Sequence, residues 1–472
     1  MALVMLAVHH ILIFVAILGL STGKDCFSST ENDRAERYCP SPGTRKCDDV
    51  HKGYRCKPKI SQYWGNHSPF FSVESKLPRA LPKECKVTFV QLLSRHGARY
   101  AIKRQAPELE KTIAQLQSTA KRYPGKYAFL KTYRYNLGVG TLTPFGEQQM
   151  INSGITFYTR YSDLARHTKP FFRTASGDRV VMSAQNFTQG FHRALSPTTP
   201  FQPYPILIIP EKSGQNNTLS HGACPAFEHS PHHGKTARSL WAQQFLPPIQ
   251  RRINSALGTA LSPMQTLSLM SMCPYTVAAD PLGRPTPFCA LFTRPEWRAY
   301  SLYATLSKYF RYGPPSPLGT SQGVGWVNEL IARLTRSPVR DNTSTNRTLT
   351  GSRETFPLDR NMYADFSHDT DMAAVMFAMN LFPDVEPTMA NIRVKEVFGA
   401  DRTVPFAGRM YVEKMVCDTG RRWGKGEMVR VLVNDRVVKL KGCGVDRFGR
   451  CELRKWLESL AWVRKGGEWE KC

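Results

Sequence analysis

Residues 95–99 read Arg-His-Gly-Ala-Arg, and these residue types suit the capture and transfer of a phosphoryl group. Guanidinium groups bind phosphate oxygens bidentately and stay charged at ordinary pH. The imidazole of His96, between Arg95 and Arg99, can attack phosphorus as a nucleophile. The alternative is a basic turn exposed to solvent, and these five residues alone do not exclude it.

A second polar segment, Ser367-His368-Asp369, supplies an imidazole and a carboxyl group. His368 can donate a hydrogen bond to a phosphate oxygen, and Asp369 can protonate a leaving oxygen as a general acid. Alone, a His-Asp pair is weak evidence, because aspartate often caps the next helix. The elements expected on either side of this segment strengthen the functional interpretation.

Both segments stand at the end of an expected strand. Residues 87–93 and 362–366 are apolar runs that predict buried strands, and residues 372–379 predict an apolar helix. Ligands of α/β proteins bind beyond the carboxyl ends of the strands. We therefore expect the two polar segments to form one site.

The rest of the chain alternates expected helices and strands. Thr143-Pro144 is a good N-cap and first turn for a helix that runs toward Tyr161. Further helices are predicted over 107–123, from Asp178, over much of 236–310 and over 326–334; strands are predicted at 171–172 and 204–209 and as a hairpin over 428–440. This pattern predicts an α/β domain interrupted by helical material.

The two polar segments resemble the paired signatures of the histidine acid phosphatases, and especially of the secreted fungal phytases. Further segments resemble phytases at 126–133, 142–149, 216–222, 322–325 and 431–438, so that the resemblance runs from about Cys47 to the last residue. One departure is Ala101, where the family usually has proline. Its loss removes no chemical group from the site, but we expect a looser loop.

The resemblance implies a large α/β domain with a mixed sheet and a smaller inserted α-helical domain, with the site at their junction. We assign 63–102, 168–235 and 318–472 to the large domain, and 103–167 and 236–317 to the smaller one. Before them we expect a signal peptide over 1–23 and a cysteine-stapled N-terminal arm over 24–62.

The family also implies a role for each candidate residue. His96 is the expected nucleophile and Asp369 the acid, while Arg95, Arg99 and His368 bind the phosphate. Arg173 is our choice for the third phosphate-binding arginine, with Arg179 the competing candidate. Lys126 is a hypothetical contact to further phosphates of an inositol ring. Because arginines supply the electrostatic stabilisation, we expect neither a metal nor another cofactor.

Twelve cysteines behind an export signal indicate disulfides. No Cys-x-x-Cys is present, which argues against a zinc site. Some cysteines lie close together in sequence, which suggests disulfides that close local loops. The family resemblance implies these local pairs and two pairs between distant cysteines. The implied pairs are Cys47–Cys56, Cys85–Cys417, Cys224–Cys472, Cys273–Cys289 and Cys443–Cys451. Cys26 and Cys39 are left over, and we expect them to pair.

Asn-x-Ser/Thr sequons support a secreted, extracellular glycoprotein. They stand at Asn66, Asn186, Asn216, Asn342 and Asn346. The apolar leader is almost long enough to anchor the chain in a membrane, but two histidines within it argue against stable insertion. Some sequons are expected to remain unused, because such triplets also arise by chance.

The charge balance limits the possible partners. Lys and Arg exceed Asp and Glu by 27, which favours an anionic substrate but fits equally a solvated basic surface. No nucleic-acid-binding motif is present. We therefore expect a monomeric enzyme that hydrolyses a small phosphate ester, most specifically phytate. The alternatives are a broad-specificity acid phosphatase of the same fold, a phosphoglycerate-mutase-like transferase, and a non-catalytic polyanion-binding wall protein.

Overall fold

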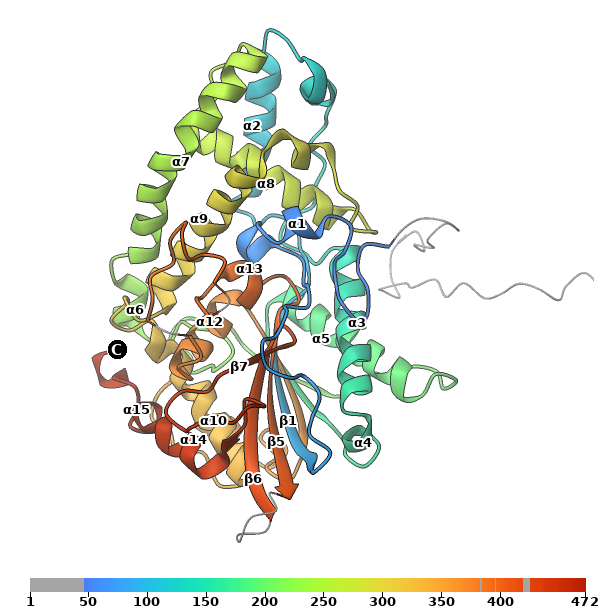
Figure 1. Ribbon diagram of the computed structural model, residues 1–472, viewed down its shortest axis with the longest axis vertical. Helices are drawn as coiled ribbons and strands as arrows, with labels where there is room; N and C mark the ends of the chain where they lie inside the picture. The colour runs from blue at the N-terminus through green and yellow to red at the C-terminus, as the bar shows by residue number, and fades with distance from the viewer. Residues whose placement is uncertain (1–45, 383, 395, 419–424) are drawn as a thin grey trace, which may run out of the picture. The chain divides into compact units, whose positions relative to one another are not determined.

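A mixed β-sheet forms the centre of the computed structural model, which describes residues 46–382, 384–394, 396–418 and 425–472 (Figure 1). The predicted signal peptide, Cys26 and Cys39 lie outside the described residues. Within them the sheet has the strands β1 (Cys85–Arg95), β2 (Phe171–Ala175), β3 (Ile206–Ile209), β4 (Met362–Ser367), β5 (Arg409–Asp418), β6 (Lys425–Val433), β7 (Arg436–Val438) and β8 (Cys451–Glu452).

The strand order is β3-β2-β4-β1-β5-β6-β7, with β8 paired to β6. The first four strands in this order are mutually parallel, whereas β5, β6 and β7 join in antiparallel fashion. The mixed sheet of the predicted fold class is therefore confirmed. The strand predicted over 204–209 is present as the edge strand β3, where Ile208 is 48% exposed.

Helices cover the sheet and build a separate helical region. The described helices are α1 (Pro58–Ser61), α2 (Ala106–Thr119), α3 (Pro144–Arg160), α4 (Ser162–Ala165), α5 (Asp178–Leu195), α6 (Pro225–His229), α7 (His233–Leu257), α8 (Pro263–Ala279), α9 (Arg294–Tyr312), α10 (Val324–Thr335), α11 (Arg347–Thr350), α12 (Asp369–Ala378), α13 (Ala400–Thr403), α14 (Leu453–Ser459) and α15 (Ala461–Arg464). Short 3-10 turns are η1 (Gly65–His67), η2 (Gly125–Lys131), η3 (Pro287–Leu291), η4 (Thr320–Gly323) and η5 (Trp469–Lys471). Figure 1 shows α2, α7 and α8 together at the end of the molecule away from the sheet.

The buried apolar side chains form two main clusters, one around the sheet and one among α2, α7, α8 and α9. The predicted domain limits remain a prediction. They assign the whole of α3 to the smaller domain, but its side chains pack in both clusters. Its first turn places Phe145 in the helical cluster, but Met150 and Phe157 belong to the cluster around the sheet. Thr143 caps this helix as expected, since its side chain accepts a hydrogen bond from Gly146 N at 3.1 Å.

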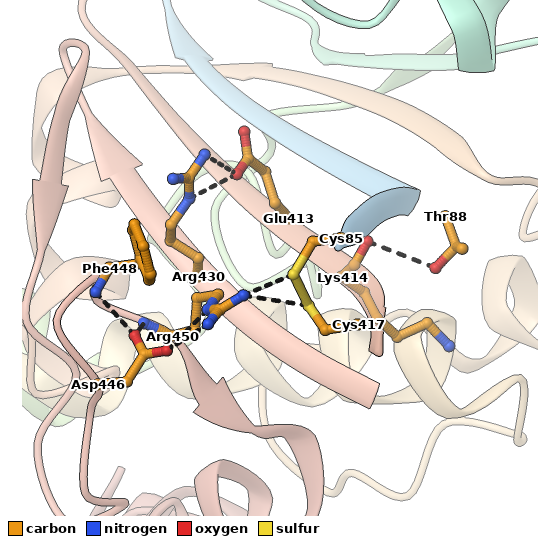
Figure 2. Close-up of a disulfide and its surroundings, with 9 residues drawn as sticks. All are labelled: Cys85, Thr88, Glu413, Lys414, Cys417, Arg430, Asp446, Phe448 and Arg450. Atoms are coloured by element: carbon orange, nitrogen blue, oxygen red, sulfur yellow. Dashed lines mark hydrogen bonds and ion pairs between the residues drawn. A yellow bond between two sulfur atoms is a disulfide. The ribbon is translucent and has the colours of Figure 1, made fainter. Parts of the chain in front are cut away.

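Disulfides fasten the described chain at five places, and each is one of the five pairs implied by the family resemblance. The pair Cys85–Cys417 joins the start of β1 to the end of β5, where the two residues face each other in the sheet register (Figure 2). Arg450 donates to Cys417 Sγ at 3.4 Å and is itself held by Asp446 (Figure 2). This bond closes the sheet at the end opposite to the candidate site.

None of the described helices is both long enough and apolar enough to cross a membrane. The predicted hairpin is present as β6 and β7. Its two turn residues, Asn434 and Asp435, adopt positive φ angles of 47° and 66°, as a tight hairpin turn requires.

Candidate active site

The carboxyl ends of β1 and β4 bring the two polar segments together. Arg95 and Ser367 are partners in the parallel register, and His96 N donates to Ser367 O at 3.2 Å. The rings of His96 and His368 lie edge to face, with their centroids 5.7 Å apart. The expectation that the two segments share one site is thus met by the sheet geometry.

Close packing against α3 and α5 fixes the loop after His96. A Cβ atom on Gly97 would lie 2.3 Å from Gly146 O, so only glycine permits this approach to the first turn of α3. Gly97 N donates to Ser183 Oγ at 3.0 Å, and Ala98 N donates to Gln149 Oε1 at 3.0 Å. Ala101 stands where the family usually has proline. It is fully buried and its carbonyl oxygen accepts from Gly140 N at 2.9 Å, so a hydrogen bond holds the loop although the proline is missing.

The imidazole of His96 is held in one neutral form. Its Nδ1 lies 2.8 Å from Gly97 O, and because a carbonyl oxygen only accepts, Nδ1 carries the hydrogen and Nε2 keeps the lone pair. Burial lowers the pKa of His96 well below its ordinary value, and the nearby Arg95 and Arg99 lower it further. The imidazole therefore remains uncharged, and hence able to attack, in acidic solution.

Three arginines surround this imidazole. Besides Arg95 and Arg99, Arg179 in the first turn of α5 acts on the pKa of His96 through its charge. The Nε atoms of all three arginines are buried and have no hydrogen-bond partner among the described residues. Phe406 lies beneath two of them, with the Arg95 guanidinium carbon 4.5 Å from its ring centroid. Buried cationic donors of this kind are suited to hold an oxyanion.

The carboxylate of Asp369, the first residue of α12, lies among cations and one amide. Its Oδ2 is 3.2 Å from Arg95 Nη2, 3.1 Å from Lys308 Nζ and 2.6 Å from Asn66 Nδ2. Burial opposes ionisation, but Arg95 and Lys308 outweigh it and hold the pKa of Asp369 well below its usual range. In the free protein, Asp369 is consequently ionised.

His368 contacts one cation and one carboxylate. Its Nδ1 lies 3.3 Å from Arg179 Nη2, and its Nε2 lies 2.8 Å from Glu211 Oε1. Glu211 follows the edge strand β3, so the ends of β1, β2, β3 and β4 all contribute to one cluster. This agrees with the rule that parallel strands gather functional groups at their carboxyl ends.

Arg173 requires a correction. The structure places it inside β2, where its guanidinium pairs with Asp365 at 2.8 Å and with Glu329, and not with His96. Arg173 and Asp365 are register partners in the middle of neighbouring strands. Arg179, the competing candidate, lies beyond the strand end and contacts His368, so Arg179 and not Arg173 lies beside the candidate site.

Lys126 is not brought into the cluster by any contact that the structure describes. It belongs to η2, and its Nζ donates to the carbonyl oxygens of Ala290 and Leu291 at 3.3 and 3.1 Å. Lys308, which sequence reasoning missed, contacts Asp369 instead. It lies on the long helix α9, far from either motif in sequence, and no local pattern marks it.

The Nδ2 atoms of three of the five predicted sequon residues donate hydrogen bonds in the structure, and that of Asn216 donates to Thr345 O at 3.1 Å. The Nδ2 atom of Asn66 donates to Asp369, and that of Asn186, in the middle of α5, donates to Met182 O at 2.9 Å. Asn186 is also only 8% exposed. Asn66, which contacts the candidate site, and the buried Asn186 are therefore poor acceptors, whereas Asn216 and Asn342 are exposed and Asn346 is partly exposed. Among the described residues, no group of three His, Cys, Asp or Glu side chains is arranged to hold a metal ion.

Known proteins resemble this chain over most of its length. It is 45% identical over 445 residues to Phytase A from Aspergillus fumigatus, covering 92% of this chain and 95% of that relative. It is 46% identical over 446 residues to Phytase A from Aspergillus oryzae, with the same coverage of 92% and 95%.

Solved structures share the fold. The phytase from D. castellii superposes with a TM-score of 0.70 at 21% identity, over 86% of this chain and 85% of that one. The Bifidobacterium longum Multiple Inositol Polyphosphate Phosphatase, solved in complex with phosphate, gives a TM-score of 0.61 at 13% identity, over 85% of this chain and 97% of that one. Residues 86–434 match the Histidine phosphatase superfamily (branch 2), and the chain belongs to that family.

Proposed function

We propose that this protein is a phosphoric monoester hydrolase that releases inorganic phosphate from phytate, myo-inositol hexakisphosphate, through a phosphohistidine intermediate. The observation that carries the proposal is the uncharged His96, with its Nε2 lone pair free, among three arginines that have unpartnered buried donors. An imidazole with a free lone pair beside cations that neutralise a phosphate is what nucleophilic phosphoryl transfer requires.

In the first half-reaction, His96 Nε2 forms a bond to phosphorus while the bond from phosphorus to the inositol oxygen breaks. Asp369 gives its proton to that departing oxygen. In the second half-reaction, water attacks phosphorus, its proton goes to Asp369, and the N–P bond breaks to release phosphate. Arg95, Arg99 and Arg179 hold the phosphoryl oxygens throughout, because their charge remains constant.

The charge state of Asp369 supports a substrate with more than one phosphate group. Asp369 is ionised in the free protein because Arg95 and Lys308 depress its pKa, yet the acid step needs its proton. Anionic phosphates that bind to these two cations would neutralise them and raise the pKa of Asp369. Acidic solution would favour the same protonation, so we propose an acid optimum.

The relatives named Phytase A, at 45% and 46% identity, support phytate as the substrate. A broad-specificity acid phosphatase of the same fold is the second candidate, and the two differ only in which phosphate esters they accept. Five disulfides among the described residues support an oxidising compartment and thus an extracellular enzyme. We propose that the enzyme acts as a monomer.

The test is phosphate release from phytate and from an aryl phosphate, with chelator present, by the wild type and by His96→Ala. We expect release by the wild type, a preference for phytate, and no release by the variant. Equal rates on both esters would favour the broad phosphatase. A wild type that releases no phosphate from either ester, or an active His96→Ala, would overturn the proposed mechanism.

A further inference from the structure

Glu211 lies in contact with the site but has no part in the mechanism described so far. It follows β3, the strand at the edge of the parallel half of the sheet. We propose that Glu211 is a positioning residue for His368: its carboxylate fixes the hydrogen of the imidazole on Nε2 and stabilises the imidazolium that forms when phosphate binds. This inference rests on the proposed function and deepens it.

The carboxylate is itself held at a defined place. Glu211 Oε1 accepts from Gly177 N at 3.3 Å and meets His368 Nε2 at 2.8 Å, while the backbone N of Glu211 donates to Ser176 Oγ at 2.9 Å. Ser176 and Gly177 follow β2, and His368 follows β4. One side chain therefore ties together the ends of three neighbouring parallel strands. Its side chain is 23% exposed, so it remains partly solvated.

The two partners of His368 determine the position of its hydrogen. Arg179 can only donate, so Nδ1 of His368, at 3.3 Å from Arg179 Nη2, must accept. The hydrogen of the neutral ring then lies on Nε2 and is donated to Glu211. In this arrangement His368 has no hydrogen free for a phosphate oxygen, although donation to phosphate is the role expected for it.

Phosphate binding would change this arrangement at Nδ1. When Arg179 turns its Nη2 donor to a phosphate oxygen, Nδ1 becomes free to take a proton and to donate to the phosphate. A carboxylate hydrogen-bonded to the opposite nitrogen stabilises such an imidazolium, as the aspartate of a catalytic triad does. Other charged or titratable groups near His368 are Arg179, His96 and the next residue, Asp369. Among the described contacts of the His368 ring, the carboxylate is that of Glu211.

The test compares the pH dependence of kcat and KM for phytate in the wild type, Glu211→Gln and Glu211→Asp. The matched control is Glu228→Gln, because Glu228 makes the same kind of bond to His221, at 2.7 Å, and no described contact joins this carboxylate to His96 or His368. Thermal unfolding of each variant monitors folding. We expect Glu211→Gln to lower kcat about 10- to 100-fold, as is typical when the partner of a functional histidine is removed.

The pH profile separates positioning from a merely structural role. Glu211→Gln removes the negative charge that faces the imidazolium across the 2.8 Å contact, so the alkaline limb of kcat for this variant should move to lower pH. Glu211→Asp keeps the charge and should retain the wild-type limb, and Glu228→Gln should retain both kcat and the limb. The inference would be overturned if Glu211→Gln had the wild-type kcat and pH profile. It would also be overturned if kcat fell by the same factor at every pH. A wild type without phosphatase activity would instead overturn the proposed function, and this inference with it.

Discussion

Asn66 donates its side-chain amide to Asp369 Oδ2 at 2.6 Å, across 303 positions of sequence. The backbone carbonyl of Asn66 also accepts from Arg95, so this residue contacts both motif segments. It belongs to η1, in the segment that leads from the Cys47–Cys56 disulfide to β1. The segment predicted as an N-terminal arm therefore leads directly into the candidate site.

The first prediction concerns the sequon at Asn66. A glycan on Nδ2 would occupy the space beside Asp369, so we expect the secreted protein to carry no glycan at Asn66. Enzymatic deglycosylation in heavy-oxygen water, followed by peptide mapping, detects each modified asparagine. Ser68→Ala removes the sequon but keeps the Asn66 amide. Because it also removes the buried Oγ that accepts from Trp64 N at 3.1 Å, we expect a lower Tm, while the activity of the folded enzyme stays within about twofold of the wild type. Isotope labelling of Asn66 would show that the amide is not reserved for Asp369.

Periodicity and strand position predicted most of the elements that carry the site. The apolar runs before His96 and His368 are β1 and β4, and their shared parallel edge follows from general rules for α/β sheets. The sequence could not predict which arginine reaches His96, because Arg173 and Arg179 differ by only six positions. The position relative to the end of the strand distinguishes the two arginines. Arg173 lies within β2, whereas Arg179 lies after its carboxyl end, where functional groups gather.

Asn66, Lys308 and Glu211 could not be predicted for a different reason. Each is far in sequence from the motif residue that it contacts: Asn66 and Asp369 are 303 residues apart, and Glu211 and His368 are 157 apart. A single polar residue outside a motif has no local signal, and only tertiary packing determines its neighbours. At Asn66 the local sequence is a glycosylation triplet, which predicted a glycan on the amide that in fact contacts Asp369.

The second prediction separates the two arginines. Arg173→Met would leave Asp365 and Glu329 in a buried site without this cation, which typically costs about 3–5 kcal/mol of stability. Arg179→Met would remove a proposed phosphate donor, and no ion pair within 4 Å joins Arg179 to a carboxylate among the described residues. We expect a large fall in Tm for the first variant, and for the second a near-normal Tm with kcat/KM reduced about 100-fold, or about 3 kcal/mol of transition-state stabilisation. The reverse pattern in calorimetry and phosphate-release assays would return the phosphate-binding role to Arg173.

The third prediction concerns Asp48, whose Oδ2 accepts from Asn152 Nδ2 at 2.5 Å. Burial raises the pKa of Asp48 to about 7. Since the folded protein binds this proton more tightly than the unfolded chain, the stability from Asp48 is full below pH 4 and is lost as pH rises through 7. We expect Asp48→Asn to match the wild type near pH 4 and to be more stable by on the order of 2 kcal/mol at pH 7. Urea unfolding at both pH values measures this difference, and a gap that does not depend on pH would contradict it.

The fourth prediction addresses the acid role of Asp369. Asp369→Asn cannot protonate the departing oxygen, so kcat on phytate should fall about 10²- to 10⁴-fold. A nitrophenyl phosphate, whose leaving group needs little protonation, should lose much less. The variant should also bind inorganic phosphate more tightly, because a carboxylate beside Arg95 and Lys308 no longer repels the anion. Steady-state kinetics on both esters and phosphate titration measure these effects. Equal losses on both esters would assign Asp369 to phosphate positioning, because the cost would then not depend on the basicity of the leaving oxygen.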